Sequence, residues 1–156
     1  MSETNASISR RQFCQLASGA TVAAFVTGCS GGSSSPGAPS SSAPVLLGVV
    51  SGQFAGSSVQ VQTAGTALTD VGGAALVQSV AGVFLVARTS ASAFTTVEAV
   101  CTHEGCTVNG QDGSIYVCPC HGSRYDRNGH VVGGPATASL RQYPNSFANG
   151  VVTIAV

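Results

Sequence analysis

The sequence contains no lysine and little charge of either sign, and this scarcity excludes one broad class of protein. Six arginines balance six acidic residues, so the formal net charge is zero, and charged residues make up only 8% of the chain. No basic stripe could neutralise phosphates, and no run of like charges suggests an interaction tail. The composition therefore argues against a nucleic-acid-binding protein.

Long helical patterns are also lacking. Glycine, alanine, serine, threonine and valine dominate the chain, and no extended segment repeats its apolar residues with a helical period. Short apolar runs instead alternate with glycine-rich turns from Val45 onward, which predicts an all-β domain with a sandwich or barrel-like core. The expected strands are Val45–Val50, Val59–Thr63, Ala75–Val80, Val83–Ala87, Thr96–Val100, Ser114–Cys118, His130–Val132, Leu140–Tyr143 and Val151–Val156.

Local signals refine this expectation. Residues 83–86 are apolar without alternation, as in a strand that is buried on both faces. The pair Asp112-Gly113 predicts a hairpin between residues 106–111 and 114–118, and Asn149-Gly150 predicts another before Val151. Asn128-Gly129 marks a further turn.

The composition of the first 44 residues predicts a targeting segment followed by a linker. Residues 1–28 contain Arg10-Arg11 before a short, uncharged, weakly apolar stretch, and they resemble a twin-arginine export signal. Cys29 follows Val-Thr-Gly, as in a bacterial lipobox, so we expect it to carry lipid, and two acyl chains suffice for stable anchoring. The alternatives are an uncleaved membrane anchor and an incidental cysteine.

Residues 29–44 are rich in serine, glycine and proline, which is typical of a flexible linker. The folded domain is therefore expected over residues 45–156. The signal and the linker together predict a lipid-anchored domain on the periplasmic or cell-surface side of a bacterial membrane.

Two short segments hold four of the six cysteines and two of the three histidines. Residues 101–106 are Cys-Thr-His-Glu-Gly-Cys, and residues 118–123 are Cys-Pro-Cys-His-Gly-Ser. Two cysteines and two histidines suit either a tetrahedral zinc or a mixed-ligand iron–sulfur cluster. Zinc fingers usually pair like ligands within one segment, and zinc would leave two cysteines unexplained. The pattern therefore favours the cluster.

These two motifs resemble those of the Rieske iron–sulfur family. The resemblance covers mainly residues 97–144, and it implies a β domain with a two-loop cluster-binding subdomain. It also implies one [2Fe–2S] cluster per chain, in which Cys101 and Cys118 bind one iron while His103 and His121 bind the other.

Further residues follow from the same resemblance. Cys106 and Cys120 would form a disulfide between the two loops, which suits an oxidising compartment. Ser123 and Tyr125 occupy the positions of hydroxyl donors to a bridging sulfide and to a ligand cysteine sulfur, and such donors favour the reduced cluster. Residues 133–136, Gly-Gly-Pro-Ala, resemble a loop that covers the cluster in the family.

The resemblance implies one-electron transfer outside the cytoplasm. The expected partners are a redox-protein donor and acceptor, with a quinol or a cytochrome among the candidates. The alternative is a Rieske subunit of a quinol-oxidising cytochrome bc-type complex or of a molybdenum oxidase. Residues 107–117 lack the longer insertion of many cytochrome bc subunits.

The remaining histidine and two arginines complete the list of candidates. His130 is expected to be a solvent-exposed residue at the start of a strand. One histidine is too few for the iron site of two histidines and a carboxylate that Rieske oxygenases need, so we expect no complete active site in this chain. Arg124 and Arg127 flank Tyr125 and either help to dock a partner or are simply solvated.

Overall fold

The computed structural model describes residues 43–156, and the strands in this part of the chain form three sheets. The expectations for the signal segment, for Cys29 and for most of the linker lie outside the described residues. The predicted all-β class is confirmed, because the only helical element in 43–156 is one 3-10 turn, η1 (Ala67–Thr69). The strands are β1 (Val45–Leu46), β2 (Gly48–Ser51), β3 (Gln53–Ala55), β4 (Ser58–Gln62), β5 (Ala74–Ser79), β6 (Gly82–Arg88), β7 (Phe94–Glu98), β8 (Gly110–Asp112), β9 (Ile115–Val117), β10 (Arg124–Tyr125), β11 (Val131–Gly133), β12 (Asn145–Ala148) and β13 (Val151–Ala155).

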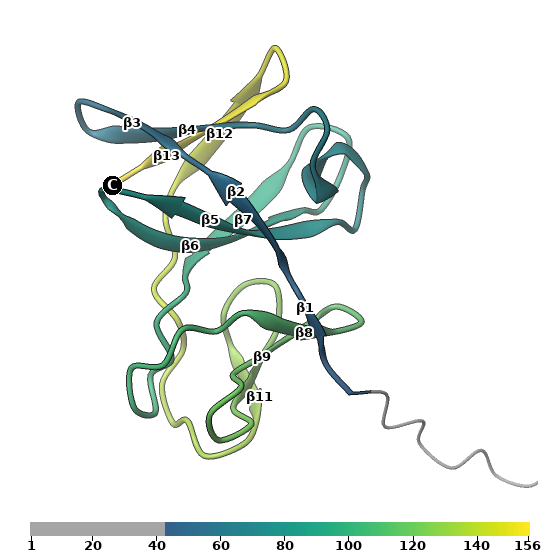
Figure 1. Ribbon diagram of the computed structural model, residues 1–156, viewed down its shortest axis with the longest axis vertical. Coiled ribbons are helices and arrows are strands. Elements are labelled where there is room, and N and C mark those ends of the chain that lie inside the picture. Colours follow the sequence, from purple (N-terminus) through teal and green to yellow (C-terminus); the bar gives the residue numbers. More distant parts are fainter. Residues whose placement is uncertain (1–42) are drawn as a thin grey trace, which may run out of the picture. The chain divides into compact units, whose positions relative to one another are not determined.

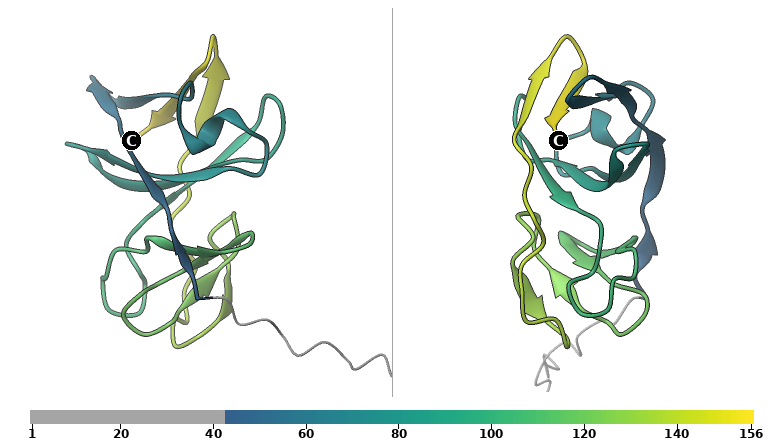
Figure 2. Two further views of the ribbon diagram at one scale, coloured as in Figure 1. Left: turned by 45° about the vertical axis from the view of Figure 1, so that its right-hand side comes forward. Right: turned by 90° about the vertical axis from the view of Figure 1, so that its left-hand side faces the viewer.

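The middle sheet, with strand order β2-β5-β6-β7, separates two hydrophobic cores. Figure 1 shows it between the β12-β13-β4-β3 sheet and the β1-β8-β9-β10-β11 sheet, and the two views of Figure 2 show the same three layers. Strand β6 is buried along Phe84–Ala87, which confirms the prediction of a strand covered on both faces. Phe84 and Val86 pack into one core, whereas Leu85 and Ala87 pack into the other.

The two cores have different roles. The core beside β12, β13 and β4 joins two sheets into a sandwich, as predicted, and none of the three sheets in the described residues closes into a barrel. The other core contains Tyr116, Tyr125 and the thiol-bearing residues Cys101 and Cys118. The residues of the two cysteine–histidine motifs are therefore anchored to the middle sheet by ordinary apolar packing.

The predicted hairpins are present, with one shift of register. Strands β12 and β13 are joined by Asn149-Gly150, and both residues adopt the positive φ angles, 51° and 78°, that a two-residue turn requires. Strands β8 and β9 are also joined by two residues, but these are Gly113 and Ser114, because Asp112 is already paired with Ile115.

Other element boundaries differ from the predicted ones. The run 45–50 is divided at Leu47, which is buried while its neighbours in β1 are exposed. The short strands β3, β10 and β12 carry little apolar pattern and were not predicted as strands. The predicted strand 140–143 is wrong, since only Gln142 forms a bridge pair, with Val97, before the chain continues into β12.

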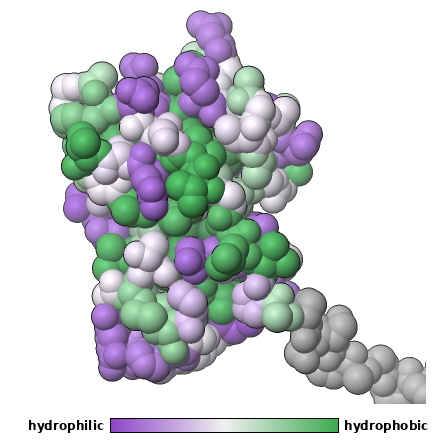
Figure 3. Space-filling view, in the orientation of Figure 1, coloured by the Kyte–Doolittle hydropathy of each residue, from purple (hydrophilic) through white to green (hydrophobic). Residues whose placement is uncertain are grey.

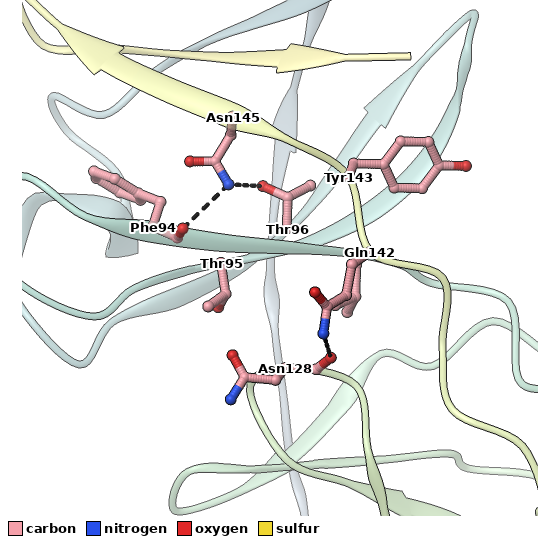
Figure 4. A pocket seen from close by; sticks show the side chains of 8 residues that line it. Phe94, Thr95, Thr96, Asn128, Gln142, Tyr143 and Asn145 are labelled. Atoms are coloured by element: carbon pink, nitrogen blue, oxygen red, sulfur yellow. Dashed lines mark hydrogen bonds between the residues drawn. The ribbon is translucent and has the colours of Figure 1, made fainter.

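The segment that leads back from β11 to β12 ties the motif-bearing layer to β7. Backbone amides of Glu98 and Tyr143 donate to the carbonyl oxygens of Arg141 and Thr96, at 2.8 and 2.9 Å. In Figure 4, the side-chain amide of Gln142 donates to the Asn128 backbone carbonyl, and that of Asn145 bonds Phe94 and Thr96 around a pocket of about 120 Å³. The backbone bonds of residues 141–143 fix the segment after β11 to the edge strand β7, whereas those of the Asn145 side chain join β12 to β7.

An apolar surface borders the second motif. Val45 and Leu46 on β1 are 66% and 70% exposed, and Figure 3 shows hydrophobic surface over this strand. Leu46, Val117 and Pro119 are among the residues that line a groove of about 310 Å³ beside the second motif. Residues 43–156 include no helix that is both long and apolar enough to cross a membrane.

Candidate metal centre

The two motifs fold into six-residue loops of the same design. Residues 101–106 lie between the bridge partners Val100 and Thr107, and residues 118–123 lie between the strand partners Val117 and Arg124. In each loop the amide of the first cysteine donates to the carbonyl of the sixth residue, and the glycine at position five donates back to the cysteine carbonyl. The sequence pattern Cys-X-X-X-Gly therefore specifies the same backbone twice.

Both loop glycines adopt a conformation that other residues rarely take. Gly105 has a φ of 76° and Gly122 a φ of 72°. A glycine allows this left-handed conformation without a clash from Cβ. This conformation lets the backbone of each loop reverse its direction after the histidine.

A disulfide between Cys106 and Cys120 joins the two loops, and this is the pairing that the resemblance implied. The two residues are separated by 14 positions in the sequence. The covalent bond holds the loops against each other, so that both Cys–His pairs line one centre.

The two remaining cysteines lie on the buried side of this centre. Cys101 is 3% exposed and Cys118 is 1% exposed. Burial raises the pKa of Cys101, but several hydrogen bonds, of which that from Tyr125 is the strongest, together lower the pKa to about 7. Burial raises the pKa of Cys118, against opposing hydrogen bonds from the backbone. Because a thiolate is the form that binds a metal, Cys101 is already prepared for that role.

The two histidines lie on the more exposed side. The His103 and His121 side chains are 27% and 48% exposed, and their ring centroids are 5.0 Å apart in an edge-to-face arrangement. The carboxylate of Glu104 reaches both rings, at 3.9 Å from Nε2 of His103 and 3.6 Å from Nδ1 of His121. The two imidazoles therefore share one carboxylate at the surface of the domain.

The donor atoms fall into two separate sets. Atoms of His103, Glu104 and His121 lie within 4.8 Å of one another at the exposed side, whereas the free thiols of Cys101 and Cys118 do not belong to this group and are buried. A tetrahedral zinc would need two thiolates and two imidazoles at a single point about 2 Å from each ligand atom. Two buried thiols and two more exposed imidazoles suit a centre with two metal positions better.

Hydroxyl groups face the buried thiols. The Tyr125 hydroxyl lies 3.3 Å from Sγ of Cys101, and the side chain of Tyr125 is fully buried. Burial raises the pKa of Tyr125, so the phenol keeps its proton at neutral pH and can donate it. Ser123 is also fully buried, and its Oγ has no hydrogen-bond partner within the protein.

The unpartnered atoms indicate what the site would accommodate. Buried polar groups are nearly always hydrogen-bonded, yet Oγ of Ser123 and Nδ1 of His103 are both buried without a partner. A group that offers metal to an imidazole nitrogen and sulfide to a hydroxyl would satisfy both atoms. The residues present therefore fit an iron–sulfur cluster held between the two loops.

A third segment packs against the second loop. Gly134 has a φ of 81°, and a Cβ at this position would lie 2.6 Å from the Gly122 carbonyl oxygen and from Cα of Ser123. Only glycine allows such close contact, so Gly134 lies directly against the second loop. That residues 133–136 cover a cluster stays a prediction.

Three further candidates lie outside the centre. His130 is exposed and its Nδ1 lies 3.0 Å from Oδ2 of Asp126, and this bond agrees with a solvated role. Arg124 forms an ion pair with Asp112 at 2.6 Å. Arg127 contacts the β8–β9 hairpin and lies over the Tyr116 ring, 4.5 Å from its centroid. Both arginines thus have structural contacts within the subdomain.

Two residues of the site were not singled out by the sequence. Glu104 could have been recognised as a carboxylate adjacent to a candidate ligand. Thr102 lies between Cys101 and His103, but its hydroxyl contacts depend on Tyr125 and on Ala138, which lies 36 positions away. No local signal in the sequence indicates that contact.

The chain is similar in sequence to several known proteins. A family model described as the Rieske [2Fe–2S] domain matches residues 52–144. The cytochrome b6-f complex iron–sulfur subunit of Prochlorococcus marinus (strain MIT 9211) is 58% identical over 45 residues, which cover 28% of this chain and 25% of that protein. The subunit of the same name from Chlorobaculum thiosulfatiphilum is 50% identical over 52 residues, covering 33% and 29%.

Among solved structures, the cyanobacterial plasma membrane Rieske protein from Synechocystis PCC 6803 is 27% identical. The match covers 53% of this chain and 86% of that chain, with a TM-score of 0.49. The chain spans only about a quarter of the length of the first curated relatives that it matches.

Proposed function

The chain belongs to the Rieske [2Fe–2S] family, and from this premise we propose that residues 45–156 form a one-electron carrier. Cys101 and Cys118 would hold one iron of the cluster, and His103 and His121 would hold the other. The bound cluster supplies a centre that accepts and releases single electrons. The observation that carries the proposal is the separation of two buried thiols from two partly exposed imidazoles.

The protein's own residues would set the properties of this carrier. The thiols lie in a core that excludes water, and the Gly134 segment packs on the second loop. The hydroxyls of Tyr125 and Ser123 offset negative charge on sulfur, which favours the reduced state. The exposed imidazoles would be the point at which electrons enter and leave, with the potential toward the upper end of the range of about −150 to +300 mV for Rieske centres.

The metal content tests this proposal directly. The full chain purified from its native host should contain two irons and two acid-labile sulfides, and it should give a rhombic EPR signal only after reduction. Cys101→Ser and His121→Ala should each abolish that signal. His130→Ala is the matched control and should retain the signal, because His130 is bonded to Asp126 instead. Stoichiometric zinc without iron would contradict the proposal.

The N-terminal residues support a place outside the cytoplasm. Export through a twin-arginine signal suits a protein whose cluster is inserted before translocation, and Cys29 would anchor the mature chain through lipid. Mass spectrometry of the membrane fraction should find a lipidated Cys29 as the first residue. Replacement of both Arg10 and Arg11 by lysine should block export. An unmodified Cys29, or a mature chain that still contains Arg11, would contradict this.

A second candidate function is supported by the named relatives. Because the matched segments of those relatives belong to cytochrome b6-f iron–sulfur subunits, this chain could serve as the Rieske subunit of a quinol-oxidising complex. Purification of the membrane form in mild detergent discriminates between the two functions. A stoichiometric cytochrome b would favour the complex, whereas a chain that purifies alone and exchanges electrons with a soluble redox protein would favour the carrier.

A further inference from the structure

The hydroxyl of Tyr125 has more potential acceptors than it has protons. It lies 3.3 Å from Sγ of Cys101 and 3.0 Å from Oγ1 of Thr102. The backbone amide of Thr102 points at the same phenol oxygen, at 3.3 Å, and can only donate to it. A phenol carries one proton, so the Tyr125 proton can serve either the sulfur or the threonine oxygen fully, but not both.

The contact of Thr102 with the Ala138 backbone decides which oxygen donates. Oγ1 of Thr102 lies 2.6 Å from the backbone carbonyl oxygen of Ala138. A carbonyl oxygen has no proton, so the threonine must supply the one in this bond. In the contact between Thr102 and Tyr125 the proton therefore comes from Tyr125. Because Tyr125 is fully buried, solvent cannot supply a second donor at the phenol.

From this proton count we propose that Thr102 is a positioning residue that lowers the reduction potential of the centre by competing with Cys101 for the Tyr125 proton. The proposal rests on the proposed function, in which Cys101 is a metal-bound thiolate without a proton of its own. A hydrogen bond to that sulfur favours the reduced state. When Tyr125 donates its proton to Thr102, its hydrogen bond to the Cys101 sulfur weakens, and the reduction potential of the centre falls.

The side chain and the backbone of Thr102 act in opposite directions. The amide N–H donates into the phenol oxygen, which polarises the phenol and strengthens its own donation. The hydroxyl instead accepts the phenol proton. Thr102→Val removes the hydroxyl and keeps both the amide and the branched shape. The Ala138 carbonyl then loses a donor, but this residue is exposed, so water can replace it.

A double-mutant cycle tests the competition in the full chain with its cluster. The midpoint potentials of the original protein, Thr102→Val, Tyr125→Phe and the double variant are measured by EPR-monitored redox titration at one pH. Thr102→Val should raise the potential in the original background and should leave it unchanged in the Tyr125→Phe background. Thr102→Ser keeps the hydroxyl and should match the original protein. Thr107→Val is the matched control, because this exposed threonine makes none of these contacts.

A spectroscopic readout separates competition from a general structural effect. Exchange into D₂O shifts the iron–cysteine stretching bands in resonance Raman spectra when the sulfur accepts a hydrogen bond. Thr102→Val should enlarge this shift, and Tyr125→Phe should remove the contribution of Tyr125. A lower or unchanged potential in Thr102→Val, or an equal rise with and without Tyr125, would overturn the proposal.

Loss of the cluster from the valine variant would lead to Thr102→Ala as the replacement in the same cycle. Loss from the alanine variant as well would also overturn the proposal, because it treats the hydroxyl as dispensable for holding the cluster. Iron and sulfide content of the unaltered protein tests the proposed function separately. The two ideas can therefore fail independently.

Discussion

The Tyr125 hydroxyl lies 3.3 Å from Sγ of Cys101, and both residues are buried in one core. This contact joins Tyr125 on β10 to Cys101, the first residue of the loop 101–106, which lies 24 positions earlier in the sequence. A hydrogen bond at this place acts on the electron distribution of the sulfur rather than on stability alone.

Tyr125→Phe should therefore lower the midpoint potential without removing the cluster. A differential hydrogen-bond energy of about 1 kcal/mol corresponds to roughly 40 mV for a one-electron couple. Ser123→Ala should act in the same direction, because its buried Oγ would lose an acceptor on the cluster. Protein-film voltammetry provides the comparison. Unchanged potentials in both variants would show that these hydroxyls bond elsewhere.

The close contact of Gly134 with the second loop predicts a sharp difference between two neighbouring glycines. Gly134→Ala would place a methyl group 2.6 Å from backbone atoms in a strained conformation, and should cost about 1–3 kcal/mol of unfolding free energy. Gly133→Ala meets only Arg124 atoms at 3.6 Å or beyond and should be close to neutral. Thermal melting monitored by cluster absorbance measures both. Equal melting temperatures for the two variants would contradict this reading of the covering segment.

The Cys106–Cys120 disulfide should contribute substantially to the stability of the subdomain. A crosslink that closes a loop of about 15 residues stabilises a protein by roughly 3 kcal/mol. Replacement of both cysteines by serine should lower the melting temperature by roughly 10 °C or more. Treatment of the original protein with a strong reductant should bring it to the same value, which controls for the serine side chains. Identical melting curves for protein with an intact and with a reduced Cys106–Cys120 disulfide would refute this prediction.

Glu104 predicts an electrostatic effect that depends on salt. Its carboxylate lies 3.6–3.9 Å from the two imidazoles and is 60% exposed. A negative charge here opposes the arrival of an electron, so Glu104→Gln should raise the potential by roughly 10–40 mV at low ionic strength. The difference should shrink as salt is added. Glu98→Gln, on β7 outside the loops, serves as the control and should change the potential less. An equal shift at all salt concentrations would argue against a charge effect.

Several parts of this fold could be predicted because their signals are local. The apolar run in β6 and the Asn149-Gly150 turn were both correctly predicted from neighbouring residues alone. The short strands β3 and β10 could not be predicted in this way. Two or three residues carry no reliable periodicity, and their extended conformation depends on a partner strand from elsewhere in the chain.

The segment 140–143 shows the same dependence in the opposite sense. Its residues have the composition of a strand, and its backbone does bond to β7. The Gly129 carbonyl nevertheless accepts the Leu140 amide, and Gln142 uses its side chain to bond Asn128. Contacts with the Asn128-Gly129 turn thus leave a single bridge pair where the sequence predicted a strand.

The sequence by itself determined the chemistry of the centre, because the candidate ligands are adjacent within two short motifs whose glycines specify the loop backbone. Tertiary structure alone decided how those ligands are surrounded. The Ala138 carbonyl reaches Thr102 from 36 positions away, and Gly134 packs on Gly122 from a third segment. Such contacts arise only when β7, β9 and the segment after β11 come together around one core. The type of centre could therefore be predicted from the sequence, whereas the hydrogen bonds around its ligands could be identified only in the folded structure.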